Sequence, residues 1–353
     1  MPDPDACSRM SGILDEALTH AASRAPDSAA FAGLVETLRA PVAGGKLVRP
    51  QLVDLGYRAA AGGPVPPADR AAVDRLGAAF ELLHTALIVH DDVIDRDTVR
   101  RGRPTVAEEH RVRLAAAGVP AGEDAHAGLS MAVIAGDALL AEALHLAVTC
   151  TPDPVRAVPV AVVVMDAATA TAAGELEDVL LGLSRHTGDE PDLARILAMQ
   201  RLKTARYSFE APLRAGALLA GSSEEFAAAL ADVGADLGVA YQVVDDVLGV
   251  FGSPAATGKS AAGDLREGKA TVVTAHGRRD PAVRALLDRA AASPGAVDAA
   301  RRGLEGAGAR EHARSVAAEL VERGRARLAA LPLGTAERSE LEAACRAVLE
   351  REA

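Results

Sequence analysis

Apolar residues recur at helical spacing along most of this chain. Leu76, Phe80, Leu83 and Leu87 follow one another at intervals of three or four residues, which places them on one face of an α-helix. The alternation of a half-buried strand is scarce. Clusters of glycine and proline interrupt the helical pattern at 41–45, 62–67, 118–122, 151–154, 188–191, 221–223, 252–263 and 277–281. The sequence therefore predicts an all-α protein of roughly ten to thirteen helices joined by short loops.

Aromatic residues make up only 2% of the chain, with no Trp, which favours closely packed helices over an aromatic-rich sheet. The β-branched run at 160–164 could form a buried strand, but its surroundings from 155 to 183 are long and Ala-rich, and we predict a helix there. The sequence has no internal repeat, linker or composition step. We expect a single domain over residues 1–353, with about the first ten residues as a loose extension.

The net charge of -11 and the pI near 5.4 argue against nucleic acid as a partner, because phosphate backbones require a clustered cationic surface. A local group of Lys and Arg can still bind a diphosphate. The three cysteines lack CxxC spacing, so neither a zinc site nor a disulfide framework is indicated, and we expect a reducing cytoplasm. The acidic N-terminus does not resemble a signal peptide, and the apolar stretch 158–165 is too short to span a membrane.

Three carboxylates gather at the end of an apolar segment. If the helix runs through Asp95, then Asp91 and Asp95 lie one turn apart on one face, with Asp92 beside them. Like charges near the negative end of the helix dipole destabilise it unless a cation binds. Magnesium suits this position, since it takes one or two carboxylates together with water and phosphate oxygens. An ordinary solvated helix end is the alternative.

Basic residues flank this acidic turn. Arg100 and Arg101 follow it directly and can bind phosphate oxygens. His84 precedes Asp91 by seven residues, two turns earlier on the same face. His84 could point into the same site, or it could be a core histidine with its hydrogen bonds satisfied.

A second acidic pair lies in another apolar helix. Asp245 and Asp246 follow Gln242 by three and four residues, so the amide shares a face with at least one carboxylate. Buried carboxylates must be paired or must coordinate a metal. Two such helices suggest facing elements that hold metal ions between them.

Lysine is rare, since only four of the 38 basic residues are Lys: Lys46, Lys203, Lys259 and Lys269. These positions could require a compact ammonium that contacts phosphate as a point charge. Retention by chance is the alternative.

The motifs together resemble the trans-isoprenyl diphosphate synthases, in a style nearest to the bacterial geranylgeranyl diphosphate synthases. The resemblance covers about residues 30 to 350 and keeps the family's order of motifs. These are GGKLVRP at 44–50, HDDVIDRDTVRRGRP at 90–104, GDALL at 136–140, KT at 203–204, YQVVDDVLG at 241–249 and GKSAAGDLREGKAT at 258–271.

The resemblance implies helices around a central cavity, and an enzyme that joins isopentenyl diphosphate to an allylic diphosphate. It implies Mg2+, with three ions when substrate is bound, and a homodimer. The implied metal ligands are Asp91, Asp92, Asp95, Asp245 and Asp246. Arg100, Lys203, Lys259 and Lys269 would surround the allylic diphosphate, and Lys46, Arg49, His84 and Arg101 would hold isopentenyl diphosphate. Thr204 and Gln242 would face the developing allylic cation, so that Lys203, Thr204 and Gln242 form the catalytic group.

The sequence departs from the family pattern at Gly249, where many members carry a third aspartate, and Ser253 does not compensate. We expect a lowered metal affinity from this difference. Ala86 stands where relatives block the growing chain with an aromatic residue, so we expect a twenty-carbon geranylgeranyl product, with Leu83, Leu87 or Met131 as the wall. The alternatives are a shorter or longer product and a non-catalytic partner subunit. A class I terpene cyclase would need a second metal motif of NSE type, which the sequence lacks.

Overall fold

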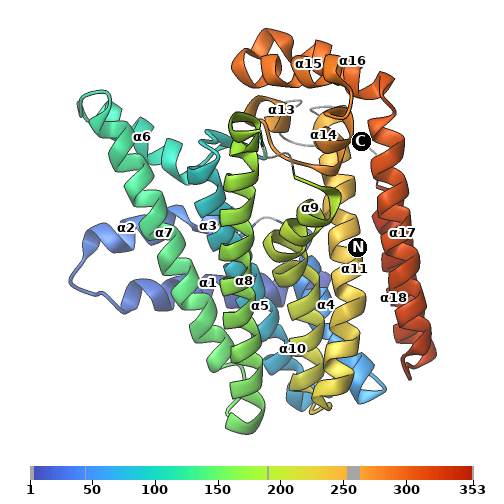
Figure 1. Ribbon diagram of the computed structural model, residues 1–353. Coiled ribbons are helices and arrows are strands. Elements are labelled where there is room, and N and C mark those ends of the chain that lie inside the picture. Colours follow the sequence, from blue (N-terminus) through green and yellow to red (C-terminus); the bar gives the residue numbers. More distant parts are fainter. Residues whose placement is uncertain (1–3, 44, 189–190, 253–262, 352–353) are drawn as a thin grey trace. The chain divides into compact units, whose positions relative to one another are not determined.

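The computed structural model describes residues 4–43, 45–188, 191–252 and 263–351, and these are helical almost throughout (Figure 1). This confirms the all-α prediction. Short helices bring the number of helices above the predicted range. The chain divides into two compact units. Unit 1 comprises Met1–Asp166 and Ala211–Ala227, and unit 2 comprises Ala167–Glu210 and Ala228–Ala353.

Unit 1 contains the first acidic motif. Its elements are α1 (Pro4–Ser23), α2 (Ala29–Thr37), α3 (Arg39–Val42), α4 (Val48–Ala61), α5 (Pro67–Ile94), β1 (Val99–Arg100), β2 (Arg103–Pro104), α6 (Val106–Ala116), α7 (Glu123–Val148), the first part of α8 (Pro154–Thr187), α10 (Ala211–Leu219) and the start of α11 (Glu224–Phe251).

The helix α5 supplies much of the core of unit 1. Leu76, Phe80 and Leu83 are fully buried, which confirms the predicted apolar face, and each such side chain stabilises the fold by about 1.5–3 kcal/mol. Helices α4 and α10 pack at backbone contact. A Cβ atom on Gly56 would lie 2.3 Å from the carbonyl oxygen of Leu213, and one on Gly216 would lie 2.1 Å from that of Val53. Only glycine fits at these two crossings.

Unit 2 contains the second acidic motif. Its elements are the remainder of α8, α9 (Leu193–Gln200), the π-helix η1 (Arg201–Glu210), most of α11, α13 (Gly263–Glu267), α14 (Val272–Gly277), α15 (Pro281–Ala292), the 3-10 turn η2 (Pro294–Ala296), α16 (Val297–Gly306), α17 (Ala309–Ala330) and α18 (Thr335–Leu349).

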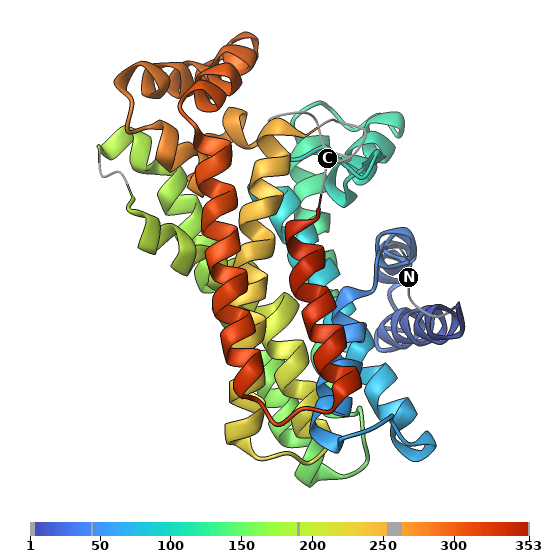
Figure 2. The same ribbon diagram turned by 90° about the vertical axis from the view of Figure 1, so that its right-hand side faces the viewer.

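The C-terminal helices α17 and α18 lie side by side (Figure 2). Ion pairs tie α17 to α11: the carboxylate of Asp236, which is buried, accepts from Arg323 Nε at 2.7 Å and from Arg327 Nε at 2.9 Å. A buried carboxylate with two guanidinium partners has its charge compensated. These contacts fix one face of the helix that carries Asp245 and Asp246.

Several details differ from the sequence-based expectations or refine them. Helix α1 begins at Pro4, so residues expected to form a loose extension are helical. The 155–183 segment lies within α8, which confirms the predicted helix.

By length and composition alone, three helices within the described residues could cross a membrane, namely α7, α8 and α11. The absence of a membrane span therefore stays a prediction.

Candidate active site

The first acidic turn lies at the carboxyl end of α5 in unit 1. Asp95 caps the helix, and its N–H donates to the carbonyl oxygen of Asp91 at 2.8 Å. The helix therefore brings Asp91 and Asp95 one turn apart, as predicted, with the buried Asp92 beside them. Arg96 has a left-handed backbone with φ of 60°, and this turns the chain out of the helix.

A short hairpin then brings an arginine back onto the carboxylates. Strands β1 and β2 are antiparallel, and the two turn residues Arg101 and Gly102 both have positive φ, 52° and 73°, as in a tight two-residue turn. Arg100 consequently donates from Nη2 to Asp91 Oδ2 at 2.9 Å, and from Nε to Asp92. Arg100 is the positive charge that the crowded acidic turn requires.

The electrostatics of this turn are those of a cation site. Burial raises the pKa of Asp92 to about 6 against the attraction of Arg100, and the neighbouring Asp91 adds to the increase. Burial would lower the pKa of the Arg100 guanidinium, but Asp92 and Asp91 raise it. The charged forms of these carboxylates are therefore favoured by any added positive charge. The oxygen donors fit a hard divalent cation such as Mg2+.

Three guanidiniums lie near His84, which precedes Asp91 by two helical turns. The pKa of His84 lies well below its usual value, chiefly because of burial and then because Arg49, Arg101 and Arg100 are close. The imidazole is therefore neutral at physiological pH. Arg49, in the first turn of α4, also contacts Glu81 Oε1 at 3.5 Å. The structure thus brings together three of the four residues predicted to hold isopentenyl diphosphate, while Lys46 is exposed just before α4.

A close contact that the sequence did not reveal fixes the end of α5 against α7. A Cβ atom on Gly136 would lie 2.2 Å from Nε2 of His90, and this nitrogen is 3.4 Å from Asp137 Oδ1. The glycine and aspartate of the GDALL motif therefore accommodate and bind the residue that precedes Asp91. The motif itself was the available signal, because glycine in a helix costs about 1 kcal/mol unless packing requires it.

The second acidic motif lies on α11 in unit 2. Asp246 is buried, and it accepts from Gln200 Nε2 at 2.6 Å and from Gln242 Nε2 at 2.7 Å. Burial raises the pKa of Asp246 well above its usual value, and the nearby Asp264 raises it further. By contrast, the side chain of Asp245 is 50% exposed. The expectation of two buried carboxylates is therefore wrong for Asp245, because successive helical residues point about 100° apart.

The residues Lys203 and Thr204 lie in the π-helix η1, a rare conformation that is frequent at functional sites. Thr204 Oγ1 donates to Gln242 Oε1 at 2.8 Å, so these two predicted catalytic residues touch. Lys203 Nζ contacts both carboxylate oxygens of Glu175 at 3.0 and 3.1 Å, and Asp178 Oδ2 at 2.6 Å. Two acidic residues of α8 therefore hold the lysine. Their carboxylates are a further set of candidate ligands for a cation.

A third carboxylate, Asp264 of α13, lies against the second motif. A Cβ atom on Gly249 would be 2.6 Å from Asp264 Oδ2, so Asp264 fills the space that a side chain at position 249 would enter. The backbone N–H of Lys269 donates to the Asp264 carbonyl oxygen at 3.0 Å, and Lys269 Nζ pairs with Glu267 at 3.1 Å. Ser253 and the predicted phosphate ligand Lys259 lie outside the described residues.

We therefore expect Gly249→Asp to bring no gain in magnesium affinity, in contrast to the expectation from sequence. The new side chain would displace Asp264 and place another negative charge near Asp246, and overpacking of this kind lowers stability by about 1 kcal/mol or more. Calorimetric titration with Mg2+ and thermal unfolding measure the two effects. The double variant Gly249→Asp/Asp264→Ala serves as the control. It should have the magnesium affinity and the Tm of the wild type. A tighter magnesium affinity in the single variant would contradict the assignment of Asp264.

The exposed carboxylate Asp245 has a cationic partner from the C-terminus. Arg351 Nη2 donates to Asp245 Oδ1 at 3.0 Å, and its guanidinium carbon lies 3.9 Å from the centre of the Tyr241 ring. A cation in contact with both a carboxylate and an aromatic face is held by two favourable interactions, an ion pair and a cation–π contact. Arg351 thus forms an ion pair with a carboxylate that is predicted to bind metal.

Removing this competing cation is expected to strengthen magnesium binding. The ion pair and the cation–π contact are together worth on the order of 1 kcal/mol at this exposure, so Arg351→Ala should tighten Mg2+ binding about two- to tenfold in the absence of substrate. Calorimetric titration measures the change. Arg346→Ala, an exposed position in the helix α18 that ends two residues before Arg351, is the matched control and should behave as the wild type. Equal affinities in all three proteins would refute the competition.

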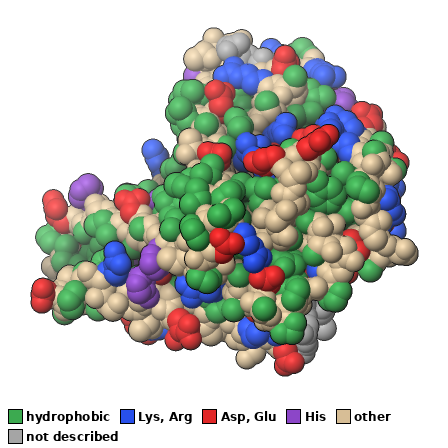
Figure 3. All heavy atoms as spheres, turned by 90° about the horizontal axis from the view of Figure 1, so that it is seen from below, with side chains coloured by type: hydrophobic (Ala, Val, Ile, Leu, Met, Phe, Trp, Pro, Cys, Tyr) green, Lys and Arg blue, Asp and Glu red, His purple; other side chains and the backbone are tan. Residues whose placement is uncertain are grey.

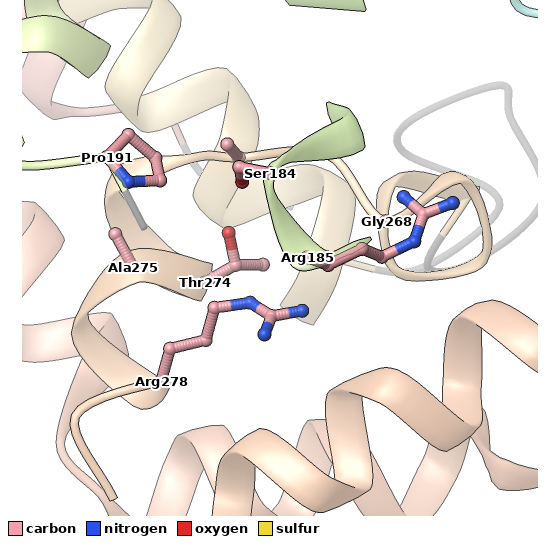
Figure 4. A pocket seen from close by; sticks show the side chains of 8 residues that line it. Ser184, Arg185, Pro191, Gly268, Thr274, Ala275 and Arg278 are labelled. Carbon is pink, nitrogen blue, oxygen red and sulfur yellow. The ribbon is translucent and has the colours of Figure 1, made fainter. Parts of the chain in front are cut away.

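A pocket in unit 2 is lined by Gly268 and Ala270, the two neighbours of Lys269 in the chain (Figure 4). Arg185 extends over Gly268, where a Cβ atom would lie 2.3 Å from Nη1, and it donates to the carbonyl oxygen of Glu267 at 3.2 Å. None of the residues lining this pocket is a predicted site residue. Arg185 instead holds the backbone that precedes Lys269.

Comparisons with known proteins identify the family. Residues 32–302 match the polyprenyl synthetase family. A geranylfarnesyl diphosphate synthase of Aeropyrum pernix is 34% identical over 85% of this chain and 87% of its own, and a geranylgeranyl diphosphate synthase of Methanosarcina mazei is 30% identical over 81% and 80%. A geranylgeranyl pyrophosphate synthase of Corynebacterium glutamicum, solved with isoprenyl diphosphate and magnesium, superposes with a TM-score of 0.89 at 27% identity over 100% of both chains. The chain therefore belongs to the polyprenyl synthetase family and is a trans-prenyltransferase.

Proposed function

We propose that this protein condenses isopentenyl diphosphate with an allylic diphosphate in a magnesium-dependent reaction that yields geranylgeranyl diphosphate. The observation that carries the proposal is the pairing of Arg100 with Asp91 and Asp92, beside a neutral His84 and two further arginines. Carboxylates for metal ions and guanidiniums for phosphate oxygens are thus held at one end of α5. This is the donor set that binding of two diphosphates requires.

In unit 1 the acidic turn would bind the magnesium ions of the allylic substrate. Asp91, Asp92 and Asp95 provide the oxygens, and Arg100 would exchange some of its carboxylate contacts for diphosphate oxygens. Arg49, Arg101 and Lys46 would hold isopentenyl diphosphate, with neutral His84 donating one hydrogen bond. Because Arg49 and Arg101 are permanently charged, this second site needs no metal.

In unit 2 the carboxylates of Asp245, Asp246 and Asp264 would take part in binding magnesium, to a total of three ions with substrate bound. Lys203, Lys259 and Lys269 would neutralise the allylic diphosphate. The chain of hydrogen bonds from Thr204 through Gln242 to Asp246 fixes two side-chain oxygens. Their dipoles would stabilise a carbocation without reacting with it.

The chemistry requires no protein nucleophile. The allylic C–O bond breaks, and diphosphate leaves with the bonding electrons. The double bond of isopentenyl diphosphate then attacks the allylic carbon, and the departed diphosphate accepts the proton that is lost. Magnesium, when bound, stabilises the negative charge of the leaving diphosphate, while the arginines and lysines named above orient it.

The growing chain is proposed to lie along α5. Ala86 is 1% exposed and lies five residues before Asp91, with the fully buried Leu83 about one turn beyond it. The two relatives named above make geranylgeranyl and geranylfarnesyl diphosphates, and the small side chain at Ala86 supports a product of at least twenty carbons. Leu83, Leu87 or Met131 of α7 would set the upper limit.

We further propose a cytoplasmic homodimer without a membrane span. Apolar side chains are exposed on α7, including Leu129, Val133 and Ile134, and a second copy of the chain would cover them. The face drawn in Figure 3 carries acidic and basic side chains interspersed with apolar ones. This distribution, with the acidic net charge, supports the exclusion of nucleic acid.

Incubation of the purified protein with Mg2+, labelled isopentenyl diphosphate and each allylic primer tests the proposal. We expect a twenty-carbon product that disappears when magnesium is chelated. No product from any primer would instead support a partner subunit of a heteromeric synthase. A cyclised hydrocarbon would indicate a terpene cyclase.

A further inference from the structure

Two histidines and a glutamate meet between α1 and α7 in unit 1, away from the acidic turn. The ligand atoms of His20, Glu142 and His145 all lie within 4.8 Å of one another. His20 Nδ1 is 3.0 Å from each oxygen of Glu142, and the rings of His20 and His145 are stacked with centroids 4.5 Å apart and an interplanar angle of 14°. We propose that this group, the α1–α7 triad, binds a divalent transition metal ion, with zinc as the best fit.

The residue types and their spacing support a metal site. Glu142 and His145 are three residues apart on α7, which places both on one face of the helix. His20 lies in the last turn of α1 and reaches the same place. Zinc binds imidazole nitrogen at about 2.0–2.1 Å and carboxylate oxygen at about 2.0–2.2 Å, so ligand atoms around one ion lie roughly 3.3–3.5 Å apart. The triad reaches that size when one imidazole rotates out of the stack, because each ring must direct a nitrogen at the ion in its own plane.

Burial explains why a cation belongs there. The side chain of Glu142 is only 7% exposed, whereas that of His20 is 37% exposed. A buried carboxylate needs a compensating positive charge, and the exposed edge at His20 leaves room for water as a fourth ligand. A simple His20–Glu142 ion pair would satisfy the carboxylate but would not use His145. Imidazole and carboxylate together favour zinc and its neighbours over Mg2+.

The α1–α7 triad is separate from the proposed magnesium ligands. Glu142 follows Gly136, the residue that contacts His90, by six positions, which corresponds to about 9 Å along the axis of α7. A metal in the triad would fasten the N-terminal helix α1 to α7. Its role is therefore structural, and it does not depend on the proposed reaction.

Cobalt absorption spectroscopy tests the site without measuring activity. Tag-free protein in excess Mg2+, which occupies the acidic sites, is titrated with Co2+, and we expect visible bands typical of imidazole ligation with one Co2+ per chain. Zn2+ should abolish these bands and raise Tm by a few degrees at saturation. It should also slow proteolysis in the 24–28 segment that joins α1 to α2.

His145→Ala is the decisive variant, because it leaves the His20–Glu142 pair in place. We expect it to weaken Co2+ binding at least tenfold and to remove the stabilisation by Zn2+, with Tm in the absence of metal almost unchanged. His126→Ala, an exposed histidine on the same helix α7, is the matched control and should bind as the wild type does. Absence of the bands, or equal Co2+ binding by His145→Ala and wild type, would overturn the proposal.

Discussion

Replacing Asp91 by Asn should lower kcat on the order of a thousandfold while the fold is kept. Asn has nearly the same shape as Asp but no charge, so a magnesium ligand loses its attraction, and a metal contact contributes several kcal/mol to stabilisation of the leaving diphosphate. Arg100 retains its contacts with Asp92 and Asp97, and we therefore expect Tm to change by only a few degrees. Steady-state kinetics with a Mg2+ titration measure the effect.

Binding of isopentenyl diphosphate provides an internal check on this variant. Its proposed ligands Arg49, His84 and Arg101 are not altered, so its Kd, measured by calorimetry, should stay within about twofold of the wild-type value. Asp97→Asn is the matched control because Asp97 contacts the same Arg100, at 3.2 Å, but lies outside the predicted metal ligands. If both variants lost activity equally, the acidic turn would act by holding Arg100 and not by binding metal.

Local sequence patterns were sufficient to predict the helical fold and the first acidic turn. The spacing of Asp91 and Asp95 follows from the helical repeat, and so does the hydrogen bond between Gln242 and Asp246, four residues apart. The family resemblance assigned Thr204 and Gln242 to one catalytic group, and the structure joins their side chains by a 2.8 Å hydrogen bond. These features depend on short segments of chain or on motifs that keep their order.

Features created by backbone exceptions could not be predicted from periodicity. Arg100 returns to the acidic turn only because Arg96 and Arg101 adopt left-handed conformations, and non-glycine residues seldom do so. The π-helix around Lys203 also departs from the 3.6-residue repeat on which helical patterns rest. The left-handed Arg101 and the π-helical Lys203 are both predicted phosphate ligands, and local rules are most often broken at functional positions.

Contacts between distant segments could not be predicted from the sequence either. The carboxylate of Asp264 lies against Gly249, and Arg351 pairs with Asp245 over more than a hundred residues of chain. No spacing rule links such positions, because tertiary packing alone decides which side chains meet. A lone carboxylate after a glycine-rich stretch and an arginine near the C-terminus carried too weak a signal.

The product should shorten when Ala86 becomes Phe. Extension by one isoprene unit buries five more carbons, worth about 4 kcal/mol at about 0.8 kcal/mol per carbon, and this gain is lost if an aromatic ring fills the space beyond Asp91. We therefore expect Ala86→Phe to release products of fifteen carbons or fewer, and Ala86→Leu to give an intermediate distribution. Chromatography of the dephosphorylated products measures chain length.

Folding must be checked alongside product length, because Ala86 is 1% exposed and overpacking a core costs about 1–3 kcal/mol. Ala86→Ser adds almost no volume and serves as the control, with product length expected to match the wild type. Ala86→Leu keeps the test valid if the Phe variant does not fold. A folded Ala86→Phe or Ala86→Leu enzyme that still makes only the wild-type product would show that the prenyl chain does not pass Ala86. In that case the length of the product would be set on another face of α5 or on another helix.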